Sequence, residues 1–140
     1  MEDASDKTAS ARLQAIQTEL LGLARKSNRA PDDITLIAVS KTHGAETITP
    51  VLEAGHRVFG ENRVQEAAEK WPGLQRAYSD VQLHLIGALQ SNKAAVAVGL
   101  FDVIHSLDRP KLAAALARAM AESGRKPRLF VQVNTGNEPQ

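Results

Sequence analysis

The chain has 140 residues, of which 43% are hydrophobic and 24% charged, and its 17 basic and 16 acidic side chains give a net charge of +1. This composition supports a folded core, and the near-neutral charge argues against binding to nucleic acid or an anionic membrane. The absence of cysteine excludes disulfides, thiolate zinc sites and cysteine nucleophiles. Because segment 1–10 is not a signal peptide and no apolar run approaches the roughly 20 residues of a membrane helix, we expect a cytoplasmic protein.

The first predicted element is a helix from about Thr8 to Lys26, followed by the turn-forming segment 27–33. Its apolar positions recur at helical spacing and form a stripe of five residues: Leu13, Ile16, Leu20, Leu23 and Ala24.

Strands and helices are then predicted to alternate. The expected strands cover residues 34–40, 57–60, 81–87, 101–106 and 128–135. The expected helices cover residues 46–55, 62–71, 91–100 and 108–124. Proline and glycine at 72 and 73 are expected to end the second of these helices, Pro50 to lie in a first turn, and Ser91 and Asp108 to serve as N-caps. Such alternation predicts a mainly parallel sheet with helices packed outside it.

Each predicted strand ends in a polar cluster. These clusters are Ser40-Lys41-Thr42, residues 60–63, residues 87–93, His105-Ser106 and Asn134-Thr135-Gly136. Because the carboxyl ends of parallel strands meet at one edge, the clusters outline a single polar mouth, which is where ligands bind in such folds. Helix capping would explain any one cluster by itself.

Lys41 is the residue of this mouth with the most distinctive chemistry. A partly desolvated lysine at a strand end can act as a nucleophilic amine toward an aldehyde. The alternative is a lysine whose stem packs while its charge stays in water. The four histidines lack metal-ligand spacing, so no metal site is expected. No glycine-rich dinucleotide or triphosphate motif occurs either.

Five ordered motifs resemble the pyridoxal phosphate homeostasis protein family, which is related to the N-terminal barrel domain of alanine racemase. They are AVSKT, FGENRVQEA, HLIGALQSNKA, VIHSLDR and FVQVNTGNEPQ, and the likeness runs from about Ile37 to Gln140. The resemblance implies an α/β fold of the (β/α)8 TIM-barrel type with an extra N-terminal helix. About five β/α units are present, so we expect one incomplete domain over 1–140, with the leading helix in 1–30 and the β/α units in 34–140.

The resemblance also implies that pyridoxal 5′-phosphate (PLP) is held as a Schiff base on Lys41. By the same likeness Asn62, His84, Ser106 and Asn134 surround the cofactor. No catalytic residue is implied: the expected role is intracellular PLP (vitamin B6) homeostasis with little or no turnover, and PLP-dependent apoenzymes would be the recipients.

Two alternatives stay open at this point. A PLP-dependent amino-acid racemase of the same fold type would share Lys41 but needs a positioned proton donor or acceptor. The single tyrosine, Tyr78, is predicted to lie off the rim, which favours a protein without turnover. A flavodoxin-like domain that binds a nucleotide, a flavin or a partner protein would also alternate five strands with helices, and Lys41 would then be a rim charge.

The chain is shorter than the implied barrel, which needs about eight strands. The resemblance places the phosphate-binding loops in a part that this sequence does not contain. We therefore expect a truncated form, with strands one and five unpaired at their outer edges, that associates with another copy or adopts an open sheet.

Overall fold

The computed structural model describes residues 8–139. Residues 1–7 and Gln140 lie outside the described part, and with them most of the polar segment in which no signal peptide was predicted. Within residues 8–139, no helix is both long and apolar enough to cross a bilayer.

The sheet contains five parallel strands in the order β1-β2-β3-β4-β5. Their bounds are Ala38–Val39, Val58–Glu61, Gln82–Leu85, Val103–Leu107 and Arg128–Val131. In the described part of the chain β1 and β5 pair only with their inner neighbours, so the sheet is open. Strands in simple sequential order are the arrangement of a TIM barrel, whereas a flavodoxin-like sheet changes direction after its first strand. The predicted incomplete TIM-barrel-like fold is confirmed, and the flavodoxin-like alternative is wrong.

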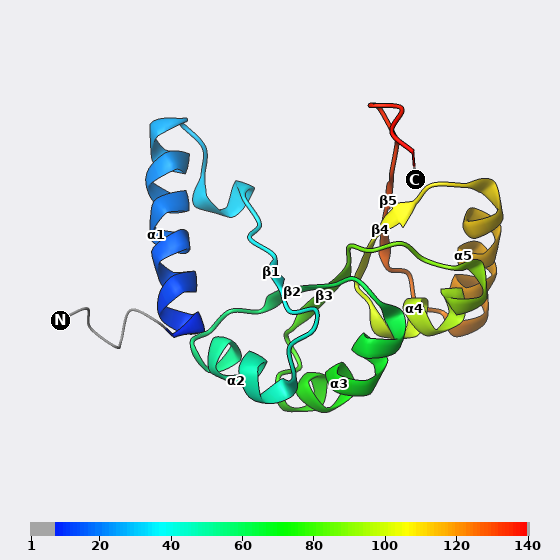
Figure 1. Cartoon of the computed structure of the whole chain (residues 1–140), viewed down its shortest axis with the longest axis horizontal. Helices are drawn as coiled ribbons and strands as arrows, with labels where there is room; N and C mark the ends of the chain where they lie inside the picture. The colour runs from blue at the N-terminus through cyan, green and yellow to red at the C-terminus, as the bar shows by residue number, and fades with distance from the viewer. Residues whose placement is uncertain (1–7, 140) are drawn as a thin grey trace.

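The helices follow the outer side of the curved sheet, and α1 stands at the β1 edge (Figure 1). The α-helices are α1 (Ala9–Lys26), α2 (Ala45–Glu53), α3 (Val64–Ala77), α4 (Ala94–Leu100) and α5 (Pro110–Ser123). Short 3₁₀ helices precede β1 and α4, at Pro31–Asp33 and Ser91–Lys93.

The hydrophobic core lies between the sheet and the helices α2 to α5. Its fully buried members include Leu52, Phe59, Trp71, Leu83, Leu85, Ile104, Leu112 and Leu116. Each side chain of this size contributes roughly 1.5–3 kcal/mol when it is removed from water. This layer therefore fixes the positions of the strand ends at which the predicted site lies.

Helix α1 begins and ends as predicted, and the Thr8 hydroxyl caps it by accepting a hydrogen bond from the Ala11 backbone N–H at 3.2 Å. Its apolar stripe is less buried than the helical spacing of the stripe predicted. Only Ala24 of that stripe is buried, while Ile16 and Leu23 are about half exposed. The reason is the position of α1, which packs against α2 at one edge of the sheet instead of lying over its face.

Two predictions about proline were wrong. Helix α3 runs through Pro72 and ends at Ala77, and Pro50 lies in the interior of α2. An interior proline costs about 3 kcal/mol because it removes a hydrogen bond and crowds the preceding turn. In α3 the burial of Trp71 and Leu74 on either side of Pro72 outweighs that cost.

The predicted caps and the first strand also differ from the structure. The N-cap positions are Gln90 and Arg109, and neither forms a side-chain capping hydrogen bond. The Asp108 carboxylate instead accepts a hydrogen bond from Arg109 at 2.6 Å. The first strand is shortened because its neighbour β2 begins only at Val58, which is level with Ile37, so residues 34–36 have no strand beside them.

Candidate functional site

Lys41 lies in a tight turn directly after β1. The His43 backbone N–H closes this turn on the Ser40 carbonyl at 3.2 Å, and Thr42 adopts a left-handed conformation with φ of +64°. The Lys41 side chain is exposed rather than partly desolvated, and it forms no ion pair within residues 8–139. Its amine is therefore available to a ligand at the carboxyl end of the sheet.

A buried carboxylate lies beneath this turn. Glu61 at the end of β2 is 0% exposed, and its Oε1 accepts hydrogen bonds from the Ser40 hydroxyl at 2.7 Å and the Trp71 indole N–H at 2.8 Å. The Lys70 ammonium of α3 contacts the same oxygen at 2.8 Å. A charge buried this fully needs such partners, because desolvation without them costs several kcal/mol.

Lys70 also binds the backbone of the turn. Its ammonium donates to the carbonyl oxygens of Ser40 at 2.7 Å and His43 at 2.8 Å, and it contacts Glu66 Oε1 at 3.1 Å. Glu66 in turn accepts the Thr42 backbone N–H. Four polar groups of the turn are thus bound by three charged side chains from β2 and α3.

Two histidines face each other across β3 and β4. His84 Nδ1 and His105 Nε2 are 2.8 Å apart, so one nitrogen donates its hydrogen to the other. The His105 ring stacks on Phe130 of β5, with centroids 5.1 Å apart. Burial, followed by the neighbouring His105, lowers the pKa of His84, and burial lowers the pKa of His105. The pair is therefore mainly neutral near pH 7.

Two predicted site residues carry buried polar atoms that have no partner in the described part of the chain. These atoms are His84 Nε2 and the Ser106 hydroxyl oxygen. Ser106 is 2% exposed and lies at an irregularity in the β4–β5 register between Ile104 and Leu107. Buried polar groups are nearly always hydrogen-bonded, so these two atoms need a polar partner such as a ligand or water.

Asn62 follows β2 and is held by backbone packing. A Cβ added to Gly87 would lie 2.1 Å from the Asn62 carbonyl oxygen, so only glycine permits this close approach. The contact joins the chain after β2 to the chain after β3, at the same end of the sheet as Lys41.

Asn134 is the predicted site residue that the structure uses differently. It is exposed, its amide N–H donates to the Glu138 carbonyl at 2.8 Å, and its side-chain oxygen accepts the Glu138 backbone N–H at 3.3 Å. The side chain therefore closes a local loop after β5, and no hydrogen bond joins it to the other predicted site residues in the described structure.

Sequence reasoning left the role of Glu61 open and did not single out Lys70. Glu61 could have been found because it is a carboxylate at the end of the strand Val58–Glu61, where a buried charge must be paired. The signal for Lys70 was its place beside Trp71 on the buried side of α3, three residues after the fully buried Ala67.

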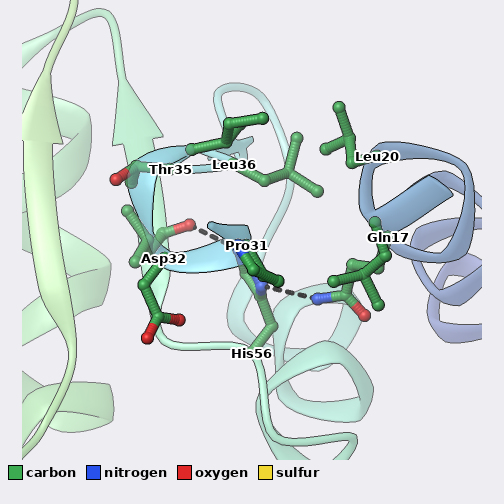
Figure 2. A pocket seen from close by; sticks show the side chains of 10 residues that line it. Gln17, Leu20, Pro31, Asp32, Thr35, Leu36 and His56 are labelled. Atoms are coloured by element: carbon green, nitrogen blue, oxygen red, sulfur yellow. Dashed lines mark hydrogen bonds between the residues drawn. The ribbon is translucent and has the colours of Figure 1, made fainter. Parts of the chain in front are cut away.

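A separate hollow of about 490 Å³ lies at the opposite, amino-terminal end of β1 and β2 (Figure 2). His56 lies in its wall, donates from Nε2 to the Val58 carbonyl at 2.7 Å and accepts from the Gln17 amide at 3.3 Å. Burial lowers the pKa of His56. Because ligands of parallel α/β folds bind at the carboxyl ends of strands, we assign this histidine the structural role of joining α1 to β2.

Other candidate chemistry is sparse among residues 8–139. No group of three or more histidine, aspartate or glutamate side chains could hold a metal ion there. Tyr78 caps the end of α3, and the Arg57 guanidinium lies 5.1 Å from the centre of its ring. Tyr78 thus lies before β3, away from the carboxyl ends of the strands.

A profile of the family described as "Alanine racemase, N-terminal domain" matches residues 12–138. The chain belongs to this family. The match covers nearly all of the sequence, so the family assignment extends from α1 to the loop after β5.

Named relatives are consistent with this assignment. The pyridoxal phosphate homeostasis protein of Vibrio alginolyticus is 37% identical over 116 residues, which are 81% of this chain and 50% of that protein. PipY of Synechococcus elongatus, solved without PLP, is 47% identical with a TM-score of 0.73 over 86% of this chain and 55% of that one. The structure of PipY with PLP bound is 46% identical with a TM-score of 0.71, over 85% and 55% of the two chains.

The predicted resemblance to pyridoxal phosphate homeostasis proteins is confirmed by these relatives. The chain spans about half the length of the relatives that it matches.

Proposed function

We propose that this chain binds pyridoxal 5′-phosphate as part of intracellular PLP homeostasis, with the cofactor attached to Lys41 Nζ as a Schiff base. The observation that carries the proposal is the exposed Lys41 amine, presented by a tightly bound turn at the carboxyl end of the sheet. The similarity to PipY, which has been solved with PLP bound, and to the named homeostasis proteins supports the same cofactor.

The neighbouring residues fit such a ligand. His84 Nε2 and the Ser106 hydroxyl are buried polar atoms without partners, and a polar ligand at this end of the sheet would give them one. Asn62 and Asn134 complete the proposed set, although Asn134 would first have to release Glu138. A bound PLP supplies an aldehyde for the lysine and an electron-withdrawing ring, while the protein supplies orientation.

The proposal includes little or no catalytic turnover, a cytoplasmic location, and transfer of PLP to apoenzymes that depend on it. The names of the relatives support a homeostatic role. Tyr78, the only tyrosine, lies away from the strand ends and is not positioned there as a proton donor. Incubation of the PLP-loaded chain with L-alanine should give no D-alanine, and racemisation at an enzyme-like rate would favour the racemase instead.

The attachment to Lys41 is tested by borohydride reduction followed by peptide mapping. We expect a visible absorbance band on addition of PLP and, after reduction, a label on the peptide that contains Lys41. Lys41→Ala should abolish both, because Lys41 is the only lysine among residues 40–43 and the neighbouring Lys70 ammonium is bound by Glu61, Glu66 and the turn carbonyls. The matched control is Lys126→Ala. Lys126 is an exposed lysine before β5, at the other end of the sheet, and this variant should behave as the unchanged chain does. A label on another lysine, or a band that survives Lys41→Ala, would refute the proposal.

A further inference from the structure

We propose that Lys70 is a positioning residue for Lys41, acting with Glu61 and Glu66 through the backbone of the turn at residues 40–43. The expected effect on the reactivity of Lys41 rests on the proposed function. The statement that Lys70 holds this turn in one conformation does not depend on any cofactor.

The turn needs an external support. Ser40 and His43 are its first and last residues, and Thr42 occupies the third position with φ of +64°. Glycine or asparagine is usual there, because a positive φ brings the side chain against the backbone. For a β-branched residue this conformation is strained by about 1–3 kcal/mol, and it persists only where the surroundings hold it.

Helix α3 supplies that support through Lys70. The Lys70 ammonium bonds the carbonyl oxygens of Ser40 and His43 at 2.7 and 2.8 Å, so it joins both ends of the turn. Its side chain is only 11% exposed, and Glu61 Oε1 and Glu66 Oε1 hold its charge at 2.8 and 3.1 Å. Hydrogen bonds from a charged donor in such a partly buried place are among the strong ones.

The position of Lys41 between the bound groups explains why this support concerns it. The Ser40 hydroxyl points toward the helix layer and donates to the buried Glu61. The Lys41 side chain, by contrast, is exposed and forms no ion pair with this network within residues 8–139. The network therefore binds the backbone on both sides of Lys41 and leaves its side chain unbound, so it fixes the point from which that side chain extends.

Two measurable consequences are expected from this arrangement. Loss of the Lys70 ammonium should loosen the turn while the sheet stays intact. It should also weaken the covalent attachment of PLP to Lys41 more than the non-covalent binding of an analogue without an aldehyde, because only the covalent bond depends on where the amine is held.

The first measurement is amide hydrogen exchange on the chain without cofactor. In Lys70→Met, exchange of the Thr42 and His43 amides should become about tenfold faster, the loss expected for one or two hydrogen bonds. The backbone amides of Asp102 and Arg128, which bond across β3, β4 and β5, should be unchanged. Lys126→Met is the matched control and should leave all four amides as they are. Equal rates at Thr42 and His43 in Lys70→Met would overturn the inference.

A second variant covers the case in which Lys70→Met leaves Glu61 as an unpaired buried charge and unfolds the chain. In the double variant Glu61→Gln, Lys70→Met no fully buried charge is left unpaired, since the remaining carboxylate of Glu66 is 29% exposed, and the amide oxygen of the new glutamine can still accept from Ser40 and Trp71. The same loss of protection at Thr42 and His43 is expected. Acceleration of the whole sheet to the same extent would assign Lys70 a merely structural role.

The second measurement compares two ligands. Lys70→Met should lower the equilibrium constant for Schiff-base formation with PLP by about tenfold, while the affinity for pyridoxine 5′-phosphate, which has no aldehyde, changes by less than about twofold. Equal losses for both ligands would count against positioning. If the unchanged chain forms no Schiff base, the proposed function fails, and the exchange experiment alone then decides whether Lys70 holds the turn.

Discussion

The two faces of the sheet differ in how much of them is covered. On the outer face, helices α2 to α5 bury the residues of the central strands completely, as the 0% exposure of Leu83, Leu85 and Ile104 shows. On the inner face Val39 and Phe130 are nearly half exposed, and the central strands carry the His84–His105 pair. The outer face holds the fold together, and the inner face with its rim carries the side chains that a ligand would meet.

Truncation of one aliphatic side chain on each face should give the largest difference in the free energy of unfolding. Leu85→Ala on the outer face should lower the free energy of unfolding by roughly 2–5 kcal/mol, because it leaves a cavity in a packed core. Val39→Ala on the inner face, where the side chain is 48% exposed, should cost less than about 1 kcal/mol. Urea unfolding of both variants measures the two values. Equal costs would mean that the inner face is packed as tightly as the outer one.

A pair of glycine substitutions sharpens the comparison at the rim. Gly87→Ala should destabilise the chain by about 1–3 kcal/mol, because the new methyl group meets the Asn62 backbone. Gly99→Ala in α4 is the control: nothing lies within 4 Å of its added Cβ, so the change should stabilise the helix by about 0.5–1 kcal/mol. Thermal unfolding of the two variants shows whether each substitution lowers or raises the stability. A neutral Gly87→Ala would show that the strand ends are not held against each other.

The smallest expected effect is the pH dependence that the inner-face histidines confer. Burial and His105 lower the pKa of His84, Arg128 adds to this and Asp102 opposes it, and burial lowers the pKa of His105. The unfolded chain then binds more protons than the folded one below the ordinary histidine value of about 6.5. Stability should therefore fall as the pH drops from 7 to 5, by at most about 1.4 kcal/mol per pH unit for each such group.

Urea unfolding between pH 5 and 8 measures this slope, and His84→Gln should reduce it. His56 contributes in the same direction, since burial lowers its pKa too, so His56→Gln is the comparison variant at the other end of the sheet. An unchanged slope in His84→Gln would show that the histidine pair does not titrate differently in the folded and unfolded chains.

The order and type of the main elements could be predicted from the sequence because apolar periodicity and core burial agree here. The alternation that predicted the five strands also buried Leu83 and Leu85, and Thr8 and Gly124 flank α1 and α5 as expected. The extent of the elements could not be predicted in the same way. It depends on partners far away in the chain, as for residues 34–36, which lack a neighbouring strand, and for α3, which continues through Pro72 with Trp71 and Leu74 buried on either side of it.

In the candidate site, too, the features that are local in the sequence could be predicted and the long-range contacts could not. Lys41 was singled out because an amine at the end of an apolar strand is unusual, and the structure places it at the rim of the sheet. The role of Lys70 could not be predicted from spacing, because its contacts to Ser40 and His43 join residues 27 to 30 positions apart. The role of Asn134 stays a prediction, and its amide is bonded within the local loop after β5.

The Trp71 contact with Glu61 has a practical consequence. Trp71 is the only tryptophan in the sequence, and its fully buried indole donates to the carboxylate that also holds Ser40 and Lys70. Light absorbed by indole is re-emitted at a wavelength and intensity that depend on the local polarity and charge. The indole emission therefore originates two side chains away from Lys41, and it offers an optical signal for events in that turn without any attached dye.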